Sequence, residues 1–202
     1  RRAEIAEKSL NDTNGAIVHY EEVLERQPDP RAFVELRRLY RASERFGDLM
    51  ALLEREATEA ETPEAQAKVH EEMGALASKE LSDLDRAFSE FETALDLVPS
   101  HGPTLDRIEE LLVSEEGGAR AAETLEAEIA KLADHARLLR MLETRARVVA
   151  DEDDKRELLT RAKETAEIRL HDPDRAFEIS RGLIGLGWPD EALLADLERL
   201  AA

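Results

Sequence analysis

The sequence has 202 residues, and its 47 Asp and Glu outnumber its 28 Lys and Arg, which gives a formal net charge of −19. It contains no cysteine, so disulfides, thiolate nucleophiles, iron–sulfur clusters and Cys-ligated zinc are all excluded. A chain this acidic repels the phosphates of DNA and RNA, and no nucleic-acid partner is expected.

No apolar run approaches the ~18 residues of a membrane-spanning helix, so no membrane insertion is expected. The start of the sequence lacks the apolar stretch of a signal peptide. Since its first residue is Arg1 rather than Met, we expect a fragment of a larger protein or a processed chain. A cytoplasmic location is the expectation, with an upstream targeting segment left open.

The composition predicts helices along the whole chain, because good helix formers dominate it and β-branched residues are sparse. All seven prolines fall between segments whose apolar residues recur every three to four positions. Together these patterns predict an all-α fold of about twelve helices. Their expected ranges are 2–11, 13–27, 30–44, 47–60, 63–81, 84–98, 103–115, 118–132, 134–150, 153–171, 173–186 and 189–201. Because the connections are short, successive helices should run antiparallel.

Three stretches, 6–17, 77–88 and 166–177, align with one another without a gap. Each contains Ala, then Leu, Asp and a second Ala at the same spacing, as in Ala77, Leu81, Asp83 and Ala87. The first Ala and the Leu end one helix, the Asp caps the next, and the second Ala lets two helices approach closely. Each stretch is therefore predicted to be a helix–turn–helix unit.

The residues that follow these stretches resemble the tetratricopeptide (TPR) repeats. The second helix of that family carries a small residue, an aromatic four positions later, a small or apolar residue three after that, and a closing proline. Two segments match it, Ala16, Tyr20, Val23, Pro28 and Ala87, Phe91, Ala94, Pro99. The next first helix matches with Phe33, Leu36 and Tyr40, followed by Phe46.

This chain departs from the family pattern at several positions. None of its expected helices carries the family's Trp, Arg37 stands where the family has Gly, and Ile179 and Ser180 lie near an expected aromatic. It is similar to the degenerate TPR proteins of large-genome social bacteria. The resemblance implies a right-handed superhelical solenoid of antiparallel hairpins, forming a single domain over 1–202.

The spacing of the repeats is uneven. Ala16 and Ala87 are 71 residues apart, about two repeats, whereas Ala87 and Ala176 are 89 apart. The excess has room for one helix and a turn. We therefore predict three helices between 103 and 150, against two between 30 and 60. A stacking irregularity is expected at 103–150, with its corner at 115–118.

No motif indicates catalysis, a cofactor or a metal site. The five histidines are scattered and are expected on the surface. The acidic run 151–154 lacks the ligand spacing of a calcium loop and is expected to cap a helix. Gly182, Gly185 and Gly187 have no preceding strand and are interpreted as a helix C-cap. The prediction is that the protein is not an enzyme and has no catalytic residue, cofactor or metal.

In this family the first helices line a concave groove that binds peptides or partner helices. With Phe33, Leu36 and Tyr40 toward the core, Arg31, Val34, Arg38 and Arg41 should face that groove. Arginine grips carboxylates bidentately, so the expected partner is another protein or peptide, with an acidic segment as one candidate.

Three alternatives stay open. These arginines could instead pair with Glu35, Glu44 and neighbouring helices on a solvated face. The chain could be a structural spacer or self-association segment without a groove ligand. The most remote alternative is a helical enzyme with no recognisable motif.

Overall fold

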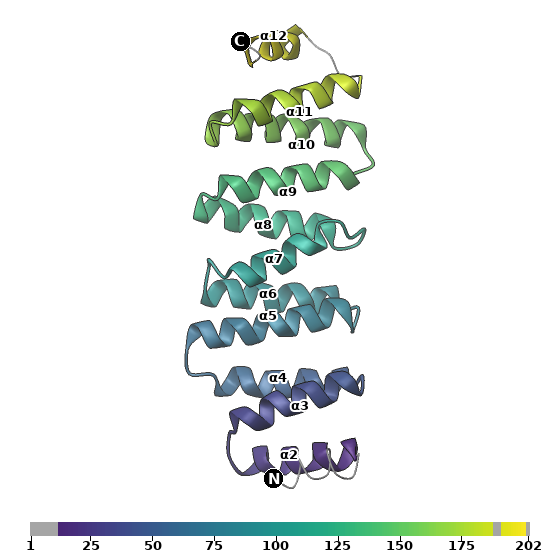
Figure 1. The fold of residues 1–202 in the computed structure, drawn as a ribbon, viewed down its shortest axis with the longest axis vertical. Coiled ribbons are helices and arrows are strands. Elements are labelled where there is room, and N and C mark those ends of the chain that lie inside the picture. Colours follow the sequence, from purple (N-terminus) through teal and green to yellow (C-terminus); the bar gives the residue numbers. More distant parts are fainter. Residues whose placement is uncertain (1–11, 188–190, 201–202) are drawn as a thin grey trace. The chain divides into compact units, whose positions relative to one another are not determined.

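The computed structural model describes residues 12–187 and 191–200, and every regular element in them is a helix (Figure 1). The all-helical prediction is thereby confirmed, with eleven α-helices among the described residues against about twelve expected. The expected helix 2–11 lies outside the described part. The chain forms two compact units, and the division falls between Thr104 and Leu105 in the sequence. The expectation of one continuous domain over 1–202 stays a prediction.

The described helices of the first unit are α2 (Thr13–Arg26), α3 (Pro30–Ala42), α4 (Phe46–Glu59), α5 (Pro63–Lys79) and α6 (Leu84–Leu97). Helix α7 (Gly102–Leu111) contains the boundary. The second unit continues with α8 (Gly118–Leu132), α9 (His135–Val148), α10 (Glu152–Glu164), the π-helix η1 (Thr165–Arg169), α11 (Pro173–Gly185) and α12 (Glu191–Leu200). From α2 to α6, and again from α8 to α12, each helix packs against the next one in the chain.

The aligned stretches form the same tight joint in both units. Ser82 and His171 occupy the left-handed region, with φ of 54° and 52°, directly before the capping residues Asp83 and Asp172. The amide of each Asp donates to the carbonyl of the aligned alanine, at 2.9 Å in both joints. The Asp83 and Asp172 carboxylates then accept from the Arg86 and Arg175 amides in the first turn of the next helix, each at 2.9 Å. The helix–turn–helix reading of these two copies is confirmed, whereas residues 6–11 of the first copy lie outside the described part.

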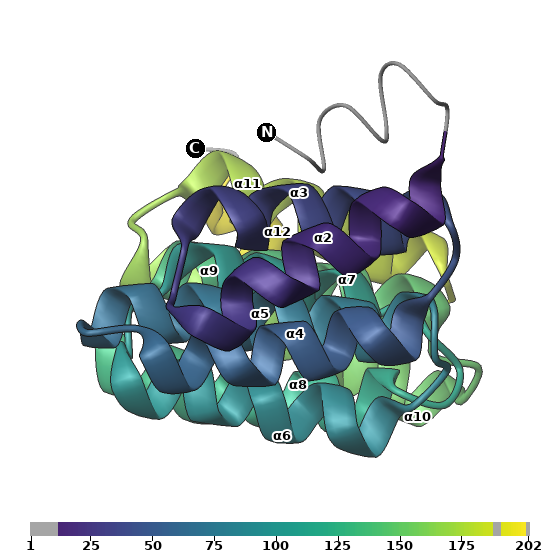
Figure 2. The same cartoon turned by 90° about the horizontal axis from the view of Figure 1, so that it is seen from below.

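Polar links also join helices that are two apart in the chain. Arginine and lysine side chains reach carboxylates or carbonyl oxygens 28 to 35 residues away. In the first unit these pairs are Arg55–Leu24, Arg37–Glu72, Arg41–Glu72 and Arg86–Glu54. In the second they are Arg137–Asp106, Arg137–Glu109, Arg140–Glu109, Arg145–Leu112, Arg161–Glu126, Arg175–Glu143, Lys163–Asp196 and Arg199–Glu167. Figure 2 shows one such neighbouring pair, α4 and α6.

Three helices, α7, α8 and α9, occupy 102–148, and two, α3 and α4, occupy 30–59. The predicted additional helix is thus confirmed, and its effect on stacking stays a prediction. Helix α7 was expected to reach 115 but ends at Leu111, where a turn begins in which the Ser114 hydroxyl accepts from the Gly117 amide at 3.1 Å. Gly118 then opens α8 against the end of α7, since a Cβ there would lie 2.7 Å from the Leu112 carbonyl oxygen.

The single helix expected over 153–171 is present over 152–169, but it changes from an α-helix to a π-helix. After Glu164 the chain forms η1, and the Leu170 amide donates to the Thr165 carbonyl five residues back, at 3.1 Å. The wider turn follows Thr165, whose hydroxyl donates to the Arg161 carbonyl inside the preceding helix at 2.8 Å. The aligned end of α5 makes a matching bond, because the Leu81 amide donates to the Leu76 carbonyl five residues back at 3.3 Å, although α5 stays α-helical to Lys79.

Candidate functional site

Helix α3 carries all the residues that the sequence nominated for binding. It begins with Pro30 after the capping Asp29, whose carboxylate accepts from the Arg31 and Ala32 amides at 2.8 and 3.2 Å. Its buried face consists of Ala32, Phe33, Leu36, Leu39 and Tyr40, so the core residues expected here are confirmed. The opposite face remains exposed.

The structure places Arg31, Val34, Arg38 and Arg41 on this exposed face of α3. Val34 is 63% exposed, the largest fraction among the exposed large apolar side chains of the described residues. Together with Arg31 it lines a surface hollow beside Tyr20 and Val23 of α2. Within the part of the chain that the structure describes, the Arg31 guanidinium has no ion-pair partner.

The other two arginines of the set are engaged. Arg38 pairs with Glu35 one turn earlier at 3.0 Å, which is the local pairing expected as the alternative to ligand binding. Arg41 reaches Glu72 on α5 at 3.1 Å, rather than Glu44 on its own side of the joint. The four residues therefore divide into an open pair, Arg31 and Val34, and a paired set, Arg38 and Arg41.

Sequence reasoning missed Arg37, which holds three helices together. Its guanidinium lies 2.5 Å from Glu56 on α4 and 2.5 Å from Glu72 on α5, and the three side chains are mostly buried. Removing the cation would leave two carboxylates close together in a partly desolvated place. The sequence did contain a hint of this link. Arg37 occupies the position of the family's glycine, and Glu72 follows it about one repeat later.

Tyr40 lies on the buried face of α3 and contacts α2. Its hydroxyl donates to the Glu21 carboxylate on α2, and the Arg45 guanidinium lies 4.9 Å from its ring centre. Burial and this hydrogen bond to an anion raise the pKa of the Tyr40 hydroxyl. The phenol stays protonated and fixes α2 against α3 beside the hollow.

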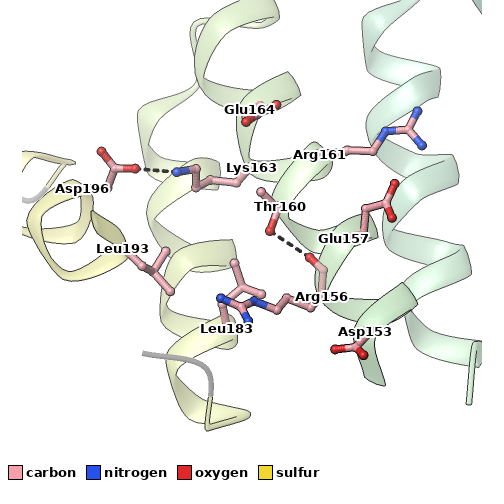
Figure 3. A pocket seen from close by; sticks show the side chains of 10 residues that line it. All are labelled: Asp153, Arg156, Glu157, Thr160, Arg161, Lys163, Glu164, Leu183, Leu193 and Asp196. Atoms are coloured by element: carbon pink, nitrogen blue, oxygen red, sulfur yellow. Dashed lines mark hydrogen bonds and ion pairs between the residues drawn. The ribbon is translucent and has the colours of Figure 1, made fainter. Parts of the chain in front are cut away.

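The second unit contains a groove between α10 and α12 that no sequence motif indicated (Figure 3). Its apolar surface is formed by Leu183 of α11 and Leu193 of α12, both buried. Figure 3 shows Lys163 of α10 extending to Asp196 of α12, and the two charged groups are 2.5 Å apart. Lys163 thus spans the groove as a link between alternate helices.

The charges around this groove are largely engaged in such links. Arg199 lies 3.1 Å from Asp196 and 2.6 Å from Glu167, and Arg161 pairs with Glu126 on α8. The hydrogen bonds from Lys163 and Arg199 lower the pKa of Asp196. We interpret the α10–α12 groove as a structural seam whose cations are used within the fold.

The expected helix caps are confirmed. The Asp151 carboxylate accepts from the Asp154 amide at 3.0 Å at the start of α10. Helix α11 ends at Gly185, and Gly187 follows with a positive φ of 86°. Both segments therefore serve helix ends.

The histidines are less exposed than expected. His70 and His101 are half-buried and make side-chain hydrogen bonds of 2.7 Å to Glu90 and Thr104. His19 and His135 are half-buried as well and His171 is exposed, so none of the five is fully buried. The described residues contain no group of three or more His, Asp or Glu placed to hold a metal ion.

No family model matches the chain, and no curated protein matches it either. In residues 12–187 and 191–200, none of the helices combines the length and the apolar character needed to cross a membrane.

Proposed function

We propose that this chain is a non-enzymatic helical-repeat scaffold of the TPR type that binds a segment of a partner protein. Its architecture would be a right-handed superhelical solenoid of antiparallel hairpins. The polar links between alternate helices support this proposal, because their sequence separations cluster near the ~34-residue period of such repeats. Repeat stacks of this kind are held together by contacts between neighbouring repeats.

The observation that carries the binding role is the hollow on α2 and α3. An exposed valine, an arginine without a partner among the described residues and the side chains of Tyr20 and Val23 meet there. The valine offers apolar area, and the guanidinium can accept a carboxylate in a forked geometry. An extended peptide with an aliphatic residue next to Asp or Glu complements both features.

The test is quantitative affinity capture from the lysate of the source cells, comparing the wild-type chain with an Arg31→Glu, Val34→Asp variant. We expect a specific protein to be retained by the wild type and reduced at least ~10-fold by the variant, because a repelling charge and a lost apolar contact each cost about 1 kcal/mol or more.

The matched control is Arg26→Glu, Val18→Asp on α2. It changes in the same way an exposed valine and an arginine that has no side-chain partner among the described residues, and both lie outside the hollow. Circular dichroism checks that both variants keep their helicity. If the two variants retain the same proteins as the wild type, the hollow is not the binding surface. If, in addition, the molecular mass rises with concentration in light scattering, the alternative of a spacer or self-association segment is favoured.

A further inference from the structure

A separate hollow lies in the second unit, on α9, α10 and α11. Its apolar surface comes from Ala146, Leu159 and Ile179, of which Ala146 and Ile179 are buried. The hollow is open to solvent, and its volume is about 460 Å³. Five charged side chains stand around it, namely Glu143, Arg147, Lys155, Arg175 and Glu178.

Both carboxylates of this hollow are already engaged. Glu143 accepts two hydrogen bonds from Arg175, at 2.8 Å from Nε and 2.7 Å from an Nη nitrogen. This forked pair raises the pKa of Arg175. Glu178 pairs with Arg181 one turn later, at 3.2 Å. Glu143 and Glu178 therefore pair with other arginines and not with Arg147 or Lys155.

Those cations are Arg147 at the end of α9 and Lys155 in the first turns of α10. Among the residues that the structure describes, the side chains of Arg147 and Lys155 have no hydrogen-bond or ion-pair partner. Acidic partners are abundant, since the chain has 47 Asp and Glu. Other cations of this unit, such as Arg161 and Arg199, pair with carboxylates on other helices. The hollow thus combines an apolar surface with a local excess of positive charge.

We propose that this hollow binds an acidic, aliphatic peptide segment of a partner protein. A carboxylate of the segment is held between Arg147 and Lys155, and an adjacent aliphatic side chain packs over Leu159 and Ile179. The arginine supplies a planar fork for the carboxylate and the lysine a compact charge. This proposal rests on other residues than the α2–α3 hollow and does not depend on it.

The test uses the whole chain and a short fluorescein-labelled peptide of alternating Glu and Leu, with fluorescence anisotropy as the measurement. We expect saturable binding with a Kd no weaker than ~1 mM. The same peptide with Gln in place of Glu should bind at least ~10-fold more weakly, because the carboxylate is lost. Arg147→Glu with Lys155→Glu should reduce the affinity for the Glu peptide by a similar or larger factor.

The matched control is Arg26→Glu with Lys68→Glu, which changes the net charge by the same amount in the first unit. These two side chains also have no hydrogen-bond or ion-pair partner in the described part of the chain. If this control weakens binding as much as the Arg147, Lys155 variant, the attraction is general and the proposal is overturned. Equal affinity for the Gln peptide, or no binding at all, overturns it as well. Because a peptide of this composition also complements the α2–α3 hollow, each comparison is repeated in the Arg31→Glu, Val34→Asp background. Binding that persists in this background and is lost on Arg147→Glu with Lys155→Glu belongs to the α9–α11 hollow, so failure of one proposal is distinguishable from failure of the other.

Discussion

The helix pairs α5–α6 and α10–α11 share the aligned stretch at the turn between their helices, and they pack by different means. In α5–α6, Phe91 is buried against Gly74, where a Cβ would lie 2.4 Å from the ring. The residues 89 positions later are Ser180 and Lys163. Ser180 is buried and its hydroxyl donates to the Ala176 carbonyl at 2.9 Å, while Lys163 extends to Asp196.

In these repeats the turn between two helices is independent of the side chains that pack between them. Both pairs keep the left-handed residue, the capping Asp and the buried alanines at Ala77 and Ala87 or Ala166 and Ala176. In the first pair a phenyl ring occupies the space that glycine leaves. In the second pair the large side chain is Lys163 on α10, and its ammonium group forms an ion pair with Asp196 on α12. A repeat can therefore lose its aromatic residue and keep its turn.

The largest expected effect comes from removing the ring. Phe91→Ala should lower the free energy of unfolding by about 3–5 kcal/mol, because it leaves a cavity between α5 and α6. Ser180→Ala should change it by less than about 1 kcal/mol, because the hydroxyl only bonds back to its own helix. Urea denaturation followed by circular dichroism measures both. Equal losses would mean that the two pairs are filled alike.

The second effect tests the close approach of Gly74 and Phe91. Gly74→Ala should destabilise by about 1–3 kcal/mol, because the added methyl group displaces the ring. In the Phe91→Ala background the same change should stabilise by about 1 kcal/mol, because only the better helix propensity of alanine remains. A double-mutant cycle in urea measures this change of sign. If Gly74→Ala has the same effect in both backgrounds, the ring does not require the glycine.

A smaller effect should be common to both pairs. Ser82→Gly and His171→Gly should each stabilise by about 0.5–1 kcal/mol, because glycine adopts the left-handed conformation without the strain of a Cβ. As a control, Ala75→Gly inside α5 should destabilise by about 1 kcal/mol. Thermal and urea unfolding of the three variants provide the measurement. A loss of stability at Ser82 or His171 would show that these side chains contribute more than their backbone strain costs.

The smallest effect concerns the ion pair that only the second pair of helices has. The pKa of Asp196 is lowered from its ordinary value of 3.8, so its stabilising contribution is present above that pH and is lost as the pH falls through the folded-state pKa. Asp196→Asn should therefore reduce stability at neutral pH and have less effect near pH 3. The difference between wild type and variant is measured by urea unfolding at both pH values. A difference that does not change with pH would assign the contribution of Asp196 to its neutral hydrogen bonds.

The sequence predicted the helices and joints well and the candidate site only in part. Caps such as Asp83 and Asp172 were recognisable because they act on amides a few residues away. The exposure of Arg31 and Val34 followed from the apolar period of α3. The partners of Arg41 did not follow, because Glu72 is 31 residues away and only the packing of α3 beside α5 brings the two together.

By itself the sequence determined which segments are helical and which face of each is buried, since these depend on interactions within a few residues. The tertiary structure decided which charges are engaged and which remain open. Arg37 became the link between three helices, while Arg31, Arg147 and Lys155 remained without a side-chain partner among the described residues. The physical reason is that an ion pair needs contact within about 4 Å, which only the placing of whole helices creates.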